Sequence, residues 1–243
     1  MVVRILITGA DGLLGRRMCQ QFALEHEVTA VVHRKVKNPV SGINYVSHDL
    51  STSLDFSKFP ESVEVVFHLA QSSYFRDFPA GARDTFSVNV SSTVDLLEYA
   101  RQADVRKFFL ASTGGVYGAV NTPITESSDL IPPTEIGFYF ATKLASEMLS
   151  SSYKKLFEVT VIRLFFMYGP GQRFDRFLPA LVHRVLNHEV VTLAGTDGIL
   201  VNPIHVDDVS YLMGELLQRA SPSLLNVSGP DVISIRQIVE AIG

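Results

Sequence analysis

Short apolar runs alternate, over the first two thirds of the chain, with longer segments whose apolar positions recur at helical spacing. The apolar runs predict buried strands at residues 2–7, 28–32, 43–46, 63–68, 107–111 and 159–164. The segments with helical spacing predict helices at residues 12–24, 82–103 and 137–153. Strands that are apolar throughout and alternate with helices are typical of a parallel sheet covered on both faces. The pattern therefore predicts an α/β fold with a Rossmann-like, doubly wound parallel sheet.

The rhythm of the pattern changes after residue 165. The remaining segments predict helices at 176–187 and 206–219, strands at 190–193 and 224–227, and a helix that begins near Ser234. We therefore expect a Rossmann domain over residues 1–165 and a smaller lobe over residues 166–243.

Composition narrows the class of protein. Hydrophobic residues make up 47% of the 243 residues, and the net charge of −4 comes without a basic run. This balance argues against nucleic acid or a membrane surface as a partner. No apolar run approaches the roughly 18 residues that span a bilayer. The single cysteine, Cys19, fits a reducing compartment, so we expect a cytoplasmic protein.

The stretch LITGADGLLG joins the first predicted strand to the first predicted helix, with glycines at positions 9, 12 and 15. In dinucleotide-binding folds such glycines permit a tight turn, a close approach of the backbone to the pyrophosphate and close packing of the helix on the sheet. The N–H groups of the helix N-terminus then face the anion. The predicted cofactor-binding residues of this turn are Gly9, Asp11, Gly12, Leu13, Leu14 and Gly15. The alternative is an ordinary strand-to-helix turn.

The end of the second predicted strand bears on the choice of dinucleotide. NAD sites usually carry an acidic residue there, which bonds the ribose hydroxyls. This strand ends instead in His33, Arg34 and Lys35. A basic cluster suits the 2′-phosphate of NADP, so His33 and Arg34 are predicted cofactor-binding residues and NADP is favoured over NAD. The alternative is a solvated strand end, because Lys37 continues the basic stretch.

A tyrosine and a lysine, Tyr139 and Lys143, share one face of the predicted helix 137–153. The ammonium favours the phenolate, which would bring the pKa of Tyr139 down from about 10. Such a tyrosine can exchange a proton with a substrate hydroxyl or carbonyl while hydride moves to or from a nicotinamide. Ser112 and Thr113 end the fifth predicted strand, at the edge where ligands bind in such sheets.

The order and spacing of these motifs resemble the extended short-chain dehydrogenases/reductases, and among them the NAD(P)-dependent sugar epimerase/dehydratase group. The matching stretches are TGADGLLG (8–15), HDL (48–50), HLA (68–70), SVNV (87–90), ASTGGVYG (111–118), YFATK (139–143), YGPGQ (168–172) and NPIHVDDV (202–209). The resemblance runs from residue 2 to nearly the C-terminus and implies an NAD(P)-dependent enzyme.

The resemblance also implies roles for individual residues. Tyr139 matches the catalytic acid/base, Lys143 the lysine that binds the nicotinamide ribose and tunes the tyrosine, and Thr113 the group that orients the substrate oxygen. The further cofactor-binding residues are Asp49 and Leu50 near the adenine, Leu69, Ala70 and Gln71 near the nicotinamide ribose, and Ser112. Asn89 is interpreted as a structural polar residue of its helix.

The chain also departs from the family's pattern. Dehydratases of the group carry an Asp-Glu pair where this chain has Gly114-Gly115, which argues against a sugar 4,6-dehydratase. Phe166 stands where nucleotide-sugar epimerases often have Asn, and Val201 where they often have the Arg that pairs with the substrate diphosphate. Either Arg173 or Arg176 replaces that cation, or the substrate is not a nucleotide diphosphate sugar. The predicted substrate-binding residues are Thr113, Phe166 and Arg173.

The sequence therefore predicts an NAD(P)-dependent epimerase or oxidoreductase that acts on a secondary alcohol or ketone of a sugar or sugar nucleotide. Two alternatives remain: an NADPH-dependent reductase of a non-sugar carbonyl compound, because Phe166 and Val201 make the lobe more apolar, and a non-catalytic NAD(P)-binding regulatory protein. No metal site is predicted. The resemblance implies a homodimer through helices 82–103 and 137–153, and a C-terminal lobe that in the family continues past residue 243.

Overall fold

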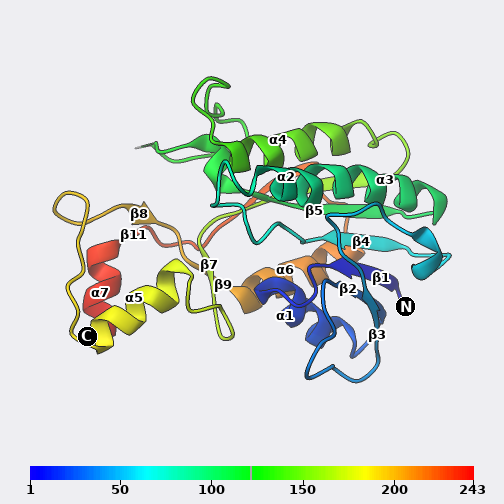
Figure 1. Cartoon of the computed structure of the whole chain (residues 1–243), viewed down its shortest axis with the longest axis horizontal. Coiled ribbons are helices and arrows are strands. Elements are labelled where there is room, and N and C mark those ends of the chain that lie inside the picture. Colours follow the sequence, from blue (N-terminus) through cyan, green and yellow to red (C-terminus); the bar gives the residue numbers. More distant parts are fainter. Residues whose placement is uncertain (121) are drawn as a thin grey trace.

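The chain folds around a seven-stranded parallel sheet in a computed structural model that describes residues 1–120 and 122–243 (Figure 1). The strand order is β10-β6-β5-β4-β1-β2-β3. Its strands are β1 (Arg4–Thr8), β2 (Glu27–Val32), β3 (Ile43–Ser47), β4 (Val65–His68), β5 (Lys107–Thr113), β6 (Glu158–Leu164) and β10 (Leu224–Val227). The predicted doubly wound parallel sheet is confirmed.

Helices cover both faces of this sheet (Figure 1). The helices around it are α1 (Leu13–Phe22) and α6 (Val206–Gln218) on one face, and α2 (Ala82–Phe86), α3 (Ser92–Gln102) and α4 (Phe138–Ser151) on the other. The side chains of β1 alternate between the two layers: Ile5 and Ile7 pack with α1 and α6, whereas Leu6 packs with α3. Burial on both faces explains why the strands are apolar at successive positions.

The predicted helix 82–103 is helical throughout but not uniform. A wider π turn, Ser87–Ser91, joins α2 to α3. Short π segments inside α-helices occur frequently at functional sites.

The predicted strand at 190–193 is wrong. Val190 is 85% exposed, and Val191 and Leu193 pack against the lobe core as an irregular segment. Two other segments, β8 (Leu200–Val201) and β11 (Ile233–Ser234), form the antiparallel pair of the lobe instead. The β-branched run therefore contributes packing without a ladder of backbone hydrogen bonds.

The lobe stands beside the sheet and contains α5 (Phe177–Leu186) and α7 (Ile235–Ile242) (Figure 1). Its core consists of Leu181, Val201, Ile235 and Ile238. A parallel pair, β7 (Met167–Tyr168) with β9 (Ile204–His205), links it to the rest of the chain.

The chain then returns from the lobe to the sheet. α6 packs against α1, and β10 pairs with β6. The division at residue 165 stays a prediction, while these two later elements pack with the sheet. In the described ranges, no helix combines the length and the apolar character needed to cross a bilayer.

Candidate active site

The glycine turn after β1 holds the chain in a form that other residues resist. Gly9 has a φ of +65°, and a Cβ there would lie 2.8 Å from backbone atoms of Ala70. A Cβ on Gly15 would overlap the carbonyl oxygen of Gly9. Both glycines are therefore required for α1 and the segment after β4 to approach the turn.

The turn fits the pyrophosphate of a dinucleotide. The N-cap of α1 is Gly12, which has no side chain to occupy the N–H groups of the first turn, and Asp11 and Gly12 are exposed. The first helical turn adds Leu13, Leu14, Gly15 and Arg16 and contains no carboxylate, while Asp11 directly precedes the N-cap. Leu14 and Gly15 are buried beneath the turn and support its shape.

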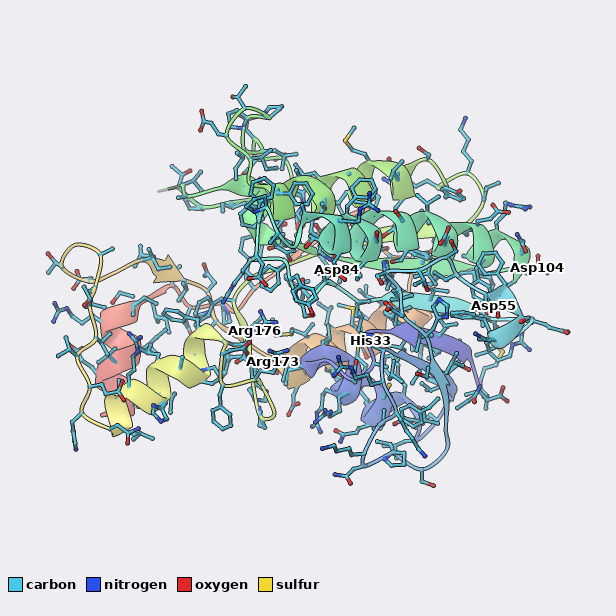
Figure 2. The ribbon with its side chains drawn as sticks, viewed as in Figure 1. His33, Asp55, Asp84, Asp104, Arg173 and Arg176 are labelled. Atoms are coloured by element: carbon cyan, nitrogen blue, oxygen red, sulfur yellow. The ribbon has the colours of Figure 1, made fainter. Side chains whose placement is uncertain are left out.

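The end of β2 brings acidic and basic groups together. His33, Arg34 and Lys35 are exposed, and His33 Nε2 lies 3.7 Å from Asp49 Oδ2 (Figure 2 labels His33). The Ser51 backbone N–H donates to Asp49 Oδ1 over 2.9 Å and lowers the pKa of that carboxyl. A carboxylate therefore stands beside the predicted 2′-phosphate cluster, supplied by the end of β3. Leu50 is buried next to it.

The Tyr139 hydroxyl lies at the carboxyl edge of the sheet, where it donates to Gln71 Oε1 over 2.8 Å. Its ring packs on Phe75, with centroids 4.8 Å apart. Burial raises the pKa of Tyr139 to about 12, and the positive charges of Arg176 and Arg76 oppose that rise. The sequence predicts that Lys143 lowers the pKa of Tyr139. In the structure this pKa is raised instead, because burial of the phenol has a larger effect than the nearby cations.

Lys143 lies one turn further along α4 and is buried. Its Nζ donates to the carbonyl oxygen of Ala111 on β5 over 3.0 Å. Burial lowers the pKa of Lys143 to about 8, and Glu147 opposes that lowering. The lysine thus carries its charge at neutral pH while it is fixed to the strand that ends in Thr113.

Thr113 and Ser112 end β5 but serve different partners. Thr113 Oγ1 accepts the N–H of Gly115 over 3.1 Å, which leaves its own O–H to donate elsewhere. The Ser112 hydroxyl donates to Glu147, which also forms a buried 2.6 Å ion pair with Arg163. Thr113 therefore keeps a free donor at the end of β5, whereas the Ser112 hydroxyl is engaged by the buried Glu147.

Asn89, in the π turn, joins two segments of the candidate site. Its Oδ1 accepts the N–H of Ser72, beside Gln71, over 3.1 Å, and its Nδ2 donates to Thr142 Oγ1, beside Lys143, over 3.0 Å. The wider turn frees the Asn89 carbonyl, which accepts hydroxyl hydrogen bonds from Thr93 and Ser146. These contacts agree with the structural role expected for Asn89.

His68, at the end of β4, is a buried neutral residue. Its Nδ1 lies 2.7 Å from Thr8 Oγ1, and its Nε2 lies 3.1 Å from Thr93 Oγ1. Burial lowers the pKa of His68 to about 3. It therefore ties β1 to α3 and offers no proton at neutral pH.

The family follows from comparison with known proteins. A family model described as the NAD dependent epimerase/dehydratase family matches residues 5–228. The chain belongs to this family. YtcB of Bacillus subtilis (strain 168), an uncharacterised UDP-glucose epimerase, is 27% identical over 266 residues, which cover 99% of this chain and 81% of YtcB.

Two solved structures extend the likeness. MoeE5 in complex with UDP-glucose and NAD is 30% identical with a TM-score of 0.84, over 98% of this chain and 80% of that one. The UDP-glucuronic acid 4-epimerase of Bacillus cereus, in complex with UDP-glucuronic acid and NAD, is 25% identical with a TM-score of 0.85, over 98% and 81%. The resemblance to the extended short-chain dehydrogenases/reductases is confirmed, and the chain is an enzyme of that NAD-dependent family.

Two residues, Phe166 and Val201, depart from the sequence pattern of the epimerase/dehydratase family. Phe166 has a φ of +32°, unusual for a large side chain, and packs on Phe177 with centroids 5.5 Å apart. Val201 is 8% exposed within the lobe core. Val201 thus packs within the lobe, and the half-buried Phe166 contacts it through Phe177.

Arg173, the predicted substrate cation, is held by a carboxylate. Its Nε and its terminal nitrogen lie 3.1 and 2.7 Å from the two oxygens of Asp175. Arg176 approaches Asp175 only to 3.9 Å. Figure 2 shows Arg176 where the lobe faces the rest of the molecule, with Arg173 close to it. Of the two candidates to replace the missing family arginine, Arg176 keeps more of its charge available.

Sequence reasoning assigned no role to Phe75 and Arg76, which lie near Tyr139, or to Glu147, which lies near Lys143. Gln71, a predicted cofactor-binding residue, accepts a hydrogen bond from the Tyr139 hydroxyl through its amide oxygen. Phe75 and Arg76 carried no prediction, because the long segment between β4 and α2 has no helical or strand periodicity that would orient it. Glu147 could have been predicted as a partner of Lys143, because it lies four residues further along the same helix. Among residues 1–120 and 122–243, no cluster of His, Cys, Asp or Glu resembles a metal site.

Proposed function

We propose that this enzyme interconverts a secondary alcohol and its ketone on a nucleotide sugar, as an epimerase or oxidoreductase, with Tyr139 as the acid/base. One observation carries the proposal: the Tyr139 hydroxyl, which donates a 2.8 Å hydrogen bond to Gln71, shares α4 with a buried Lys143 that is fixed to the strand that ends in Thr113. Relatives named as acting on UDP-glucose, and structures that hold UDP-sugars with NAD, support the substrate class.

The nicotinamide cofactor supplies the hydride acceptor and donor of this chemistry. Tyr139 exchanges a proton with the substrate oxygen as hydride leaves or returns. Thr113 donates its O–H to the same oxygen, which favours the charge that develops there. Lys143 contributes a fixed positive charge behind the tyrosine and would hold the nicotinamide ribose when the cofactor is bound. Gln71 releases the Tyr139 hydroxyl when the substrate oxygen takes its place.

The glycine turn is expected to hold the dinucleotide by its pyrophosphate, with Leu69 and Ala70 beside the nicotinamide ribose. We propose a preference for NADP, because Arg34 and Lys35 are exposed and available for a 2′-phosphate. The structural neighbours hold NAD, so NAD as the cofactor is the competing outcome. The buried Cys19 thiol agrees with a cytoplasmic enzyme.

The released cofactor tests both points. The protein is purified without added nucleotide and denatured, and the nucleotides are identified by mass spectrometry. Stoichiometric NADP(H) supports the basic cluster as a 2′-phosphate site, and stoichiometric NAD(H) contradicts it. Tight retention of either also supports epimerisation, because an epimerase returns its hydride to the same substrate molecule. A protein that binds added NADPH weakly and reversibly indicates net reduction instead.

Tyr139→Phe tests the acid/base role. The variant removes one oxygen and should keep the ring packing on Phe75. We expect turnover of UDP-glucose or UDP-glucuronate, followed by NMR of the sugar signals, to fall by about 10²–10⁴. Cofactor affinity should stay within about twofold, because the variant removes only the hydroxyl and leaves the rest of the cofactor-binding surface unchanged. Full turnover by Tyr139→Phe would rule out this role.

We also propose a homodimer through α2, α3 and α4. These helices lie side by side on one face of the molecule (Figure 1). Large apolar side chains are exposed on them: Phe86, Val94, Met148 and Leu149, with Met148 at 72%. Exposed apolar side chains on neighbouring helices mark candidate protein interfaces.

A further inference from the structure

A buried ion pair adjoins the strand end that carries Thr113. Arg163, on β6, donates to both carboxylate oxygens of Glu147, on α4, over 3.1 and 2.6 Å. The two side chains are only 5% and 10% exposed. Apolar side chains of similar volume often stabilise a buried position as well as an ion pair does, or better, because both charges lose their hydration. Fold stability alone therefore does not account for the pair.

The ion pair is bonded to the chain on both sides of Thr113. Before Thr113, the Ser112 hydroxyl donates to Glu147. After it, Arg163 donates to the Tyr117 hydroxyl over 2.6 Å, and its guanidinium carbon lies 4.8 Å from the centroid of the Tyr117 ring. Tyr117 ends the 3₁₀ turn that follows Thr113. The strand end and the turn that flank Thr113 are thus both fixed to one pair of side chains.

The Glu147 carboxylate also acts on Lys143. Lys143 Nζ donates to the carbonyl oxygen of Ala111, and Glu147, one helical turn further along α4, accepts from the next residue of β5, Ser112. Two successive turns of α4 are thus bonded to two successive residues of β5. Burial lowers the pKa of Lys143 to about 8, and the Glu147 charge opposes that lowering. Glu147 therefore favours the charged form of the lysine.

We propose that Glu147 and Arg163 are positioning residues for the proposed reaction. The pair holds the Thr113 hydroxyl in place from both sides and keeps Lys143 charged. Displacing a group that takes part in the reaction by about 1 Å can lower the rate by about 10²-fold, so a rigid support of this kind affects turnover without touching the substrate. This inference rests on the proposed function and adds two residues to it.

Other charged or titratable groups on the elements near Lys143 and Glu147 are neutral or already have partners. His68 on β4 is neutral, and Tyr139 on α4 is protonated at neutral pH. The others have these partners: Tyr117 has Arg163, Asp84 has Ser72, Lys107 has Glu158, Asp95 has the Leu54 N–H, Glu98 has Arg101 and Tyr99 has the Pro60 carbonyl. A change in the ionisation of Lys143 should therefore report on the ion pair.

Glu147→Gln tests the role in turnover, because it keeps the size of the side chain and an oxygen for Ser112 but removes the charge. Turnover of UDP-glucose or UDP-glucuronate with NAD(P) is followed by NMR. We expect kcat to fall by about 10–100-fold and KM to stay within about twofold, because the substrate contacts are unchanged. Glu158→Gln is the matched control, since it removes a carboxylate from the start of β6, and it should keep kcat. Thermal melting checks that each variant is folded.

The pH dependence separates positioning from a purely structural role. In the unmodified protein, activity should fall as the pH rises through about 8, because Lys143 loses its charge. Glu147→Gln removes the charge that favours protonated Lys143 and should move this fall to lower pH by about one unit. Arg163→Met leaves the Glu147 carboxylate without its neutralising partner and should move the fall to higher pH. Looser packing by itself would not shift the two variants in opposite directions.

Opposite shifts together with a lower kcat support the proposal. An unchanged kcat in both variants, or shifts of the same sign, overturns it. If either variant fails to fold, Ser112→Ala decides, because it removes only the hydroxyl that joins the strand end to Glu147. A lower kcat at unchanged KM in Ser112→Ala supports the proposal, and an unchanged kcat overturns it. Absence of turnover by the unmodified protein overturns the proposed function, and this inference with it.

Discussion

At the scale of single residues, the state of Tyr139 is decided by opposing contacts. Burial raises its pKa, and the charges of Arg176 and Arg76 lower it. The hydrogen bond to Gln71 acts with burial, because it is donated by the neutral phenol and is lost when the phenol ionises. Tyr139 is therefore protonated at neutral pH, and its hydroxyl donates a hydrogen bond to Gln71.

Replacing Gln71 should move that balance. In Gln71→Ala the phenol loses its acceptor and gains access to water, so we expect the pKa of Tyr139 to fall by up to about one unit. Gln71→Glu, the matched variant, places a negative charge there and should raise it. Tyrosinate absorbance reports the change, with Tyr139→Phe as the reference to isolate one of the 8 tyrosines, and the chain has no tryptophan. A higher pKa in Gln71→Ala would contradict the account.

At the scale of elements, the π turn determines how α4 and the segment after β4 are held together. We expect Asn89→Ala to lower the free energy of unfolding by about 1–3 kcal/mol, because it leaves the buried Thr142 hydroxyl and Ser72 N–H without a partner. Asn89→Asp is the matched variant, since it keeps an acceptor for Ser72 but loses the donor for Thr142. Urea denaturation measures both. Stability equal to that of the unmodified protein in both variants would show that these contacts are replaceable.

Buried His68, at the end of β4, should make the free energy of unfolding depend on pH. Its pKa of about 3 in the folded chain lies below the roughly 6.5 of an unfolded histidine, so the unfolded state takes up the proton first. The stability that neutral His68 supports is complete above pH 6.5 and is lost as the pH falls towards 3. At pH 5 the loss should be about 2 kcal/mol. Urea denaturation at pH 7.5 and 5 measures it, and His68→Gln should show a smaller difference between the two pH values.

The elements of the sheet were predictable because their signals are local. Apolar runs and helical spacing identify β1 to β6 and their helices, and the glycine turn, Tyr139 and Lys143 follow from short motifs. The partners of Tyr139 depend instead on how irregular segments fold back, which no periodicity encodes. The mistaken strand at 190–193 has a similar cause, since a β-branched run indicates a strand only where a neighbouring strand is available.

At the scale of the whole molecule, the exposed face of α3 and α4 predicts self-association. Met148→Glu places a charge at a 72% exposed position of that face. We expect light scattering after size-exclusion chromatography to give a dimer mass for the unmodified protein and a monomer mass for this variant, because an unpaired charge opposes burial at an interface. Leu186→Glu, at a 63% exposed position on the lobe, is the control and should remain dimeric. A dimer that persists in Met148→Glu places the interface elsewhere.

The late return of the chain from the lobe has a consequence for biosynthesis. During translation the edge of β6 stays open until the ribosome has made Leu224–Val227, and the apolar side of α1 stays uncovered until α6 follows the lobe. An open strand edge is a template for pairing with other chains. The nascent chain therefore keeps these surfaces exposed to aggregation until residue 227 has emerged, and holding chaperones should engage it up to that point.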